Sequence, residues 1–167
     1  GVGNKIYPID MGFDLPISFG QLWGLYTGKV FGLSVGYPYG HSAGTVMAMA
    51  CMGDPEKDSD EMDGIQNLKS FAKFISEKLK DDSLGEDEKE KIKFDVAASL
   101  QKQTEKLIRD MIGNILERYK GENFIKNVCF AGGVSLNSVC LGKLWDWFDF
   151  ENIYVTPAPH DGGLTLG

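Results

Sequence analysis

The chain has 167 residues, a net charge of −7, 43% hydrophobic residues and 25% charged residues, which is the composition of one soluble globular domain. It lacks the clustered lysines and arginines of a nucleic-acid surface. No apolar run reaches the roughly 20 residues that a membrane helix needs. Three cysteines, Cys51, Cys129 and Cys140, do not have the spacing of a zinc or redox motif. We therefore expect reduced thiols and a cytoplasmic protein.

Helical spacing begins early in the chain. Residues 1–17 are rich in turn formers and predict an irregular lead-in. Ser18 is a suitable N-cap, and the apolar spacing behind it predicts a helix over 18–31. After a loop rich in glycine and tyrosine, the apolar run 45–51 predicts a short buried helix, which Gly53-Asp54-Pro55 ends.

Charged side chains dominate residues 54–93, and we expect this region to form a helical, solvated surface. Its first part, 54–63, is acidic and polar. An amphipathic helix is predicted over 65–80, and one long helix over about 86–119. Gly113 lies inside the long helix, where glycine costs about 1 kcal/mol relative to alanine, so it predicts a close packing contact there.

Small residues line one stretch of the long helix, Ala97-Ala98-Ser99-Leu100-Gln101. They allow close packing against a sheet. Two interpretations of the polar residues remain open. Ser99 and Gln101 either face a ligand crevice or belong to a packed helix with one buried amide.

The last part of the chain has a different pattern. A strand is predicted over 127–131, a helix over 135–147 and a second strand over 152–156. A further helix is predicted to begin at His160-Asp161-Gly162-Gly163. Strand, glycine-rich turn and helix thus occur twice, which predicts an α/β fold.

The turn after the first predicted strand is a candidate ligand site. Gly132 and Gly133 let the backbone come close to a ligand, and the helix behind them would offer free N–H groups and a positive dipole end. A phosphate or nucleotide suits such a turn. The alternative is a tight strand-to-helix turn without a ligand.

Asp161 is the candidate metal ligand, since a carboxylate at the tip of a strand can hold a divalent cation or a ligand hydroxyl. A plain N-cap is the alternative. Because the two glycine-rich turns follow neighbouring strands, they can line one crevice. His41 and His160 are either ligands or bases, or exposed loop residues. No His-x-x-x-His pair occurs, so a metal site in this chain would be incomplete.

Four motifs occur in order, namely Gly44–Ala50, Ala97–Gln101, Ala131–Asn137 and Pro157–Gly167. They resemble the "GKVMGLA", "AASLQ", "AGGVALN" and "PAxGDxGxxxG" motifs of the NodU/CmcH carbamoyltransferase family. The ordered set is specific, although any one motif is not. The helix predicted over 18–31 resembles the family's segment before the first motif, so the resemblance spans about 18–167.

The resemblance implies a two-lobed, actin-like ATPase (ribonuclease-H-like) fold, here a partial lobe with long helices packed on a small sheet. In the family, a second domain makes carbamoyl-adenylate from carbamoyl phosphate and ATP, and the first domain transfers the carbamoyl group to the hydroxyl of a small metabolite. By resemblance, the metal ligand is Asp161, with iron, manganese and magnesium equally possible. The nucleotide contacts implied by the resemblance are Gly132, Gly133, Val134, Asn137, Gly162 and Gly163. No catalytic residue is assigned.

Two positions depart from the family pattern. Thr45 stands where the family usually has lysine, and His160 where it usually has a small residue. The histidines that complete the family's metal site are not matched in this chain. We therefore expect residues 1–167 to form a single partial domain, a C-terminal portion of the family's nucleotide-binding domain, without transferase turnover of its own.

Rival functions remain. The related family that makes threonylcarbamoyladenosine on transfer RNA shares the Gly-Gly-Val turn, but it usually reads "DNGAM" where this chain has His160–Leu164. A sugar or acetate kinase would need a phosphate loop that this chain does not show. A non-catalytic nucleotide-binding module is the alternative from another class, and exposed apolar surface on it would favour a homodimer.

Overall fold

A computed structural model describes residues 18–36, 41–58, 60–118 and 126–159. The described part is mixed α/β, mostly helical, with a sheet of two strands. Its helices are α1 (Phe19–Leu25), α2 (Ala43–Met49), α3 (Ile65–Lys78), α4 (Glu86–Arg118), α5 (Ser138–Gly142) and α6 (Leu144–Trp147), and its strands are β1 (Asn127–Phe130) and β2 (Asn152–Val155). A π-helical turn (Tyr26–Val30) extends α1, and 3-10 turns cover Ala50–Met52 and Gly133–Leu136. None of the helices in these ranges is both long and apolar enough to cross a membrane.

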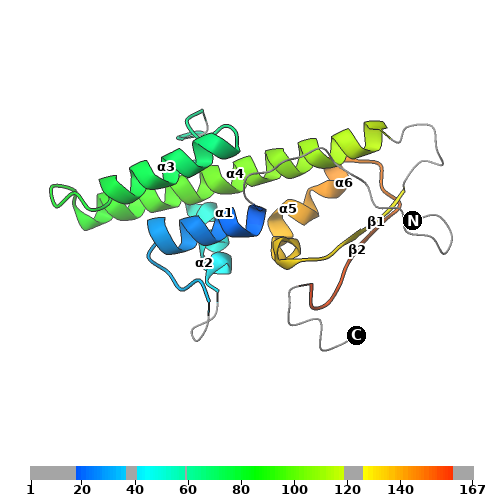
Figure 1. Cartoon of the computed structure of the whole chain (residues 1–167), viewed down its shortest axis with the longest axis horizontal. Coiled ribbons are helices and arrows are strands. Elements are labelled where there is room, and N and C mark those ends of the chain that lie inside the picture. Colours follow the sequence, from blue (N-terminus) through cyan, green and yellow to red (C-terminus); the bar gives the residue numbers. More distant parts are fainter. Residues whose placement is uncertain (1–17, 37–40, 59, 119–125, 160–167) are drawn as a thin grey trace.

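Helix α4 is the axis on which the other elements pack (Figure 1). It has 33 residues and is therefore about 50 Å long, as the predicted helix over 86–119 requires. Among the described residues, its first half shares one apolar cluster with α1, α2 and α3, while its second half shares another with α5, α6 and the strands. Helix α4 therefore connects the apolar cluster formed by the first helices to the one formed by the last helices and the strands.

The start of the chain's first helix follows its prediction closely. Ser18 and Gln21 form a reciprocal capping box, each side chain bonded to the other's backbone N–H. The helix is anchored to its neighbours by two buried hydrogen bonds. The indole of Trp23 donates to Thr104 Oγ1 at 3.0 Å, and the phenol of Tyr26 donates to the carbonyl of Leu68 at 2.7 Å. Burial raises the pKa of the Tyr26 phenol well above its ordinary value.

The middle of α4 is buried on every side, including the whole stretch Ala97–Gln101 that was predicted to pack closely. All residues from Asp95 to Gln101 are buried. The backbone at Gly53 lies directly on the helix, because a Cβ added there would be 1.9 Å from the Phe94 carbonyl oxygen. The Asp54 N–H then donates to the Asp95 carboxylate at 2.9 Å, and Lys91 pairs with the same group at 3.1 Å. Close backbone contact explains the small residues that follow Phe94.

One prediction about exposure was wrong, and a second fails at one residue. The helix predicted over 45–51 forms, but only Val46 in α2 is buried, because a single face of this short helix meets the rest of the chain. The segment 54–63 was predicted to be solvated, and most of its described residues are exposed, but Met62 is completely buried in the first apolar cluster. Ion pairs of Glu56 with Lys102 and of Asp63 with Lys106 tie this segment to α4.

The helix predicted over 135–147 is broken into a 3-10 turn, α5 and α6. Asn137 leaves the helical conformation, with φ −75° and ψ 80°, and its side chain caps α5 by accepting from the Cys140 N–H. Leu144 is buried as the spacing indicates, but Leu136 and Val139 are exposed, and Cys140, which the spacing did not include, is buried instead. A capping asparagine inside the apolar pattern is the physical reason for the break.

The strands predicted over 127–131 and 152–156 form a parallel pair in register from Asn127↔Asn152 to Phe130↔Val155. Their side chains alternate, so that Val128, Phe130 and Ile153 pack on the second apolar cluster. Because the strands are parallel, the loops that follow them begin at the same edge of the sheet. That edge is where ligands bind in open α/β sheets.

Gly113 does not mark a close approach. A Cβ at this position would lie 3.9 Å from the Phe148 ring, an ordinary contact. We therefore expect Gly113→Ala to raise the free energy of unfolding by about 0.5–1 kcal/mol, because alanine removes the entropic cost of glycine in a helix. Chemical denaturation would measure it. A loss of stability instead would mean that the Phe148 ring cannot tolerate the added methyl group.

Candidate functional site

The loops after β1 and β2 meet at the carboxyl edge of the sheet. The Gly132 N–H donates to the carbonyl of Pro159 at 2.6 Å, so the two loops are hydrogen-bonded to each other. Helix α1 also contacts the 3-10 turn Gly133–Leu136. The turn therefore lies between α1, α4 and the second loop. Both predicted glycine-rich segments start here, and the second leaves the described residues directly after Pro159.

Residues 132–136, here called the glycine turn, have open space beside their two glycines. Gly132 has φ 98°, a left-handed conformation that favours glycine, and no atom lies within 4 Å of a Cβ added at Gly132 or Gly133. The Ser135 N–H bonds back to the Gly132 carbonyl at 2.9 Å. A 3-10 turn follows the glycines in place of the predicted α-helix. The helix dipole invoked for this site is thus weaker than expected, since few peptide units are aligned.

Val134 and Asn137 are placed differently by this turn. Val134 is half-buried against the second apolar cluster, and its side chain faces inward. Asn137 is buried, with its amide paired reciprocally to the amide of Gln101. Of the two interpretations of Gln101, the structure bears out the buried amide. A nucleotide contact of Asn137 or Val134 stays a prediction, while the described contacts give each side chain a structural role.

Glu105 and Lys143 join this polar pair, and sequence reasoning had not singled them out. Gln101 Nε2 donates to one oxygen of Glu105 at 2.8 Å, and Lys143 Nζ donates to the other at 2.6 Å. Glu105 is 8% exposed, and a buried carboxylate requires such partners. Glu105 could have been predicted as a partner of Gln101, because it lies four residues later on the same face of α4.

Cys140 lies beside this network and is completely buried. Its burial, followed by the negative charge of Glu105, raises the pKa of the thiol to about 12. Cys51 and Cys129 are exposed, and all three are free thiols, as the spacing of the cysteines predicted. The buried thiol acts as a small apolar side chain here.

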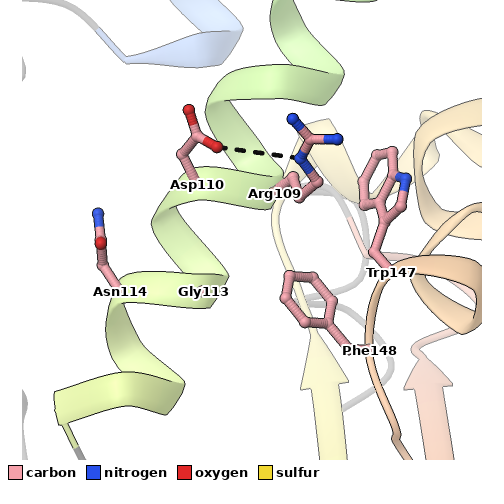
Figure 2. A pocket seen from close by; sticks show the side chains of 6 residues that line it. All are labelled: Arg109, Asp110, Gly113, Asn114, Trp147 and Phe148. Carbon is pink, nitrogen blue, oxygen red and sulfur yellow. Dashed lines mark ion pairs between the residues drawn. The ribbon is translucent and has the colours of Figure 1, made fainter.

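A shallow hollow lies away from the glycine turn, between the last turns of α4 and the end of α6 (Figure 2). The Arg109 guanidinium lies 5.9 Å from the centre of the Trp147 ring, and its Nε is 3.9 Å from the Asp110 carboxylate. Gly113, Asn114 and Phe148 complete the lining. None of these residues was predicted as a site, and the hollow does not include the glycine turn.

The remaining predicted site residues fall into two groups. His41 is described, and its Nδ1 accepts from the Ala43 N–H at 3.2 Å at the start of α2. His160, Asp161, Gly162 and Gly163 lie outside the described residues. Within the described ranges, no group of three or more histidine, cysteine, aspartate or glutamate side chains is placed to hold a metal ion. The metal site therefore stays a prediction.

A parallel strand pair, an open glycine turn at its carboxyl edge and a second loop bonded alongside define an α/β protein with the features of a ligand-binding edge. The family model described as carbamoyltransferase N-terminus matches residues 3–167. The chain belongs to this carbamoyltransferase family, as the four ordered motifs indicated.

The chain is also similar to parts of longer proteins from bacteria. The chain is 28% identical to the uncharacterized protein sll1178 of Synechocystis over its whole length, and spans 29% of that protein. The nodulation protein NolO of Bradyrhizobium diazoefficiens is 37% identical over 44% of this chain, a stretch that makes up 13% of NolO. The nodulation protein NolNO of Sinorhizobium fredii has the same identity over the same share, equal to 10% of its length.

Proposed function

We propose that this chain provides nucleotide-binding loops of an O-carbamoyltransferase with an actin-like ATPase fold. The proposed reaction transfers a carbamoyl group from carbamoyl-adenylate, made from carbamoyl phosphate and ATP, to a hydroxyl of a small metabolite. Membership of the carbamoyltransferase family supports the reaction class. The observation that carries the nucleotide site is the open glycine turn at Gly132, bonded to the loop that leads to Asp161.

The glycine turn fits a phosphate-bearing ligand. Gly132 and Gly133 are exposed and have open space where a side chain would stand, so a ligand can approach the backbone. Peptide N–H groups in such a turn offset phosphate charge without moving during the reaction. In this proposal Gly162 and Gly163 contact the nucleotide from the second loop.

Asp161 would hold the divalent metal in this arrangement, with its other ligands supplied by residues beyond the described ones. When bound, the metal would supply Lewis-acid polarisation and orientation of the carbamoyl donor. The hydrogen bond from Gly132 to Pro159 joins the glycine turn to the last described residue, two positions before Asp161 in the sequence. In this proposal the Asp161 carboxylate and the backbone of the glycine turn act on the same ligand.

The transfer itself balances simply. The acceptor hydroxyl oxygen forms a bond to the carbamoyl carbon, the bond from that carbon to the phosphate oxygen breaks, and AMP leaves with the bonding electrons. The hydroxyl proton passes to a base. In this proposal the described residues at the glycine turn bind and orient the carbamoyl donor, and the base is not assigned.

We expect Asp161→Ala to weaken ATP binding in the presence of Mn²⁺ at least tenfold, about 1.4 kcal/mol, because the metal then loses its link to the protein. Isothermal titration calorimetry with ATP, with and without Mn²⁺, would measure this. The control is Asp149→Ala, which removes an exposed carboxylate near β2, and its affinity should equal that of the wild type. Wild-type protein that binds no ATP with metal, or equal affinity in Asp161→Ala, would overturn the proposal.

A further inference from the structure

A fully satisfied polar chain connects α4 to the loop that carries the glycine turn. The Asn137 amide donates to Gln101 Oε1 at 2.9 Å, and Gln101 Nε2 donates back to Asn137 Oδ1 at 3.2 Å. The two residues are 36 positions apart, and both are less than 9% exposed. Buried amides keep their partners because an unpaired one is costly. The position of Asn137 is therefore set by a side chain of α4.

The Glu105 carboxylate fixes which way this amide pair points. A carboxylate can only accept hydrogen bonds, so the NH₂ group of Gln101 must face it. The second hydrogen of that NH₂ group faces Asn137, and Gln101 Oε1 is left to accept from the Asn137 amide. Neither amide can flip without losing these bonds.

The same carboxylate holds the other end of α5. Asn137 is the N-cap of α5, and Lys143, its C-cap, donates to Glu105 at 2.6 Å. Gln101 therefore bonds to the N-cap of α5, and Glu105 bonds to its C-cap. The Gly133–Leu136 turn lies between Asn137 and Gly132, whose N–H is bonded to Pro159. Both ends of the turn are therefore fixed, one by α4 and one by the second loop.

We propose that Gln101 and Glu105 are positioning residues for the glycine turn. They do not face its open side, but they set its shape by clamping α5, and so they set its affinity for the phosphate groups of a nucleotide. This inference rests on the proposed function for the affinity, while the clamp itself rests on the contacts of the described residues.

The test compares two variants of α4, each of which removes a buried hydrogen bond. Gln101→Ala removes the clamp on Asn137. The control Thr104→Val removes the buried bond from Trp23 and the bond from Thr104 to the Leu100 carbonyl, and neither bond involves α5. We expect Gln101→Ala to weaken ATP binding at least fivefold and to speed amide hydrogen exchange over 132–137 at least tenfold. Thr104→Val should change neither, although both variants melt at a lower temperature.

A rescue variant separates positioning from general destabilisation. Gln101→Glu alone brings two carboxylates together and should loosen the turn as Gln101→Ala does. Combined with Glu105→Gln, it restores a donor between the two positions, an acceptor for the Asn137 NH₂ group and an acceptor for Lys143. Asn137 Oδ1 loses its bond from position 101 and keeps only the Cys140 N–H. The double variant should therefore recover part of the exchange protection and of the ATP affinity that Gln101→Glu alone loses, at unchanged net charge.

Two results would overturn the clamp. One is unchanged exchange over 132–137 in Gln101→Ala, and the other is an equal increase in Thr104→Val. Failure of the proposed function gives a different result, namely wild-type protein that binds no ATP. In that case the exchange measurements still decide whether Gln101 and Glu105 position the turn.

Discussion

Gly53→Ala is expected to lower the free energy of unfolding by about 1–3 kcal/mol, the usual cost of overpacking. The new Cβ would stand 1.9 Å from the Phe94 carbonyl oxygen and 2.6 Å from the Asp95 nitrogen. Both atoms belong to the backbone of α4, so they cannot move aside as a flexible side chain would. The segment must instead separate from the helix, and the bond from the Asp54 N–H to Asp95 would be strained. Urea denaturation monitored by circular dichroism would measure the loss.

Gly44→Ala is the matched control for this substitution. Gly44 lies in α2, close to Gly53 in the sequence, and nothing stands within 4 Å of an added Cβ. Alanine should leave stability unchanged or raise it slightly, because it reduces the freedom of the unfolded chain. If Gly53→Ala were as stable as Gly44→Ala, the close contact between residue 53 and α4 would be wrong.

Long periodic elements were predictable because their signal is summed over many residues. The helices at 18–31, 65–80 and 86–119 formed close to the predicted bounds, the first with a π-helical final turn. Each carries several turns of apolar spacing, so one misplaced residue does not change the outcome. Over 135–147 a single asparagine outweighed the apolar pattern, because Asn137 gains both a capping bond and a partner in Gln101.

Burial was harder to predict because it depends on contacts between distant segments. Met62 lies among acids in the sequence and is nevertheless completely buried, since the backbone contact at Gly53 draws its segment onto α4. A local pattern cannot anticipate a contact with a residue such as Phe94. The same limit applies to the polar side of α4. Glu105 accepts a hydrogen bond from Gln101, which also bonds to Asn137. The burial of Glu105 could not be predicted, because Asn137 is distant in the sequence.

The candidate site was predicted as separate motifs, and the structure joins some of them. The glycine turn and the "AASLQ"-like stretch were recognised independently, and their link through Gln101 and Asn137 is visible only in three dimensions. Hydrogen bonding between Gly132 and Pro159 likewise joins the turn to the second loop. Roles for Asp161, Gly162 and Gly163 remain predictions from the sequence, since they lie outside the described residues.

Cys140 is expected to react with a thiol reagent at pH 8 about a thousandfold more slowly than an ordinary cysteine. The thiolate is the reactive form, and burial beside Glu105 raises the pKa of Cys140 to about 12. A rise of about three units lowers the thiolate fraction by roughly three powers of ten. Cys51 and Cys129, which are exposed, provide internal references. Labelling with iodoacetamide, followed by peptide mass spectrometry, would give the three rates in one experiment.

The pH dependence of the labelling gives the same prediction a second test. For a thiol of ordinary pKa the rate levels off above about pH 9, whereas the rate at Cys140 should keep rising towards pH 12. The sign for stability follows from the raised pKa. Below about pH 9 the thiol is protonated in both folded and unfolded chains, and as the pH rises towards 12 only the unfolded chain loses its proton, so the folded state is progressively destabilised. In urea all three cysteines should react alike. Labelling of Cys140 within tenfold of Cys129 in the native protein would show that α5 is not held against α4 as described.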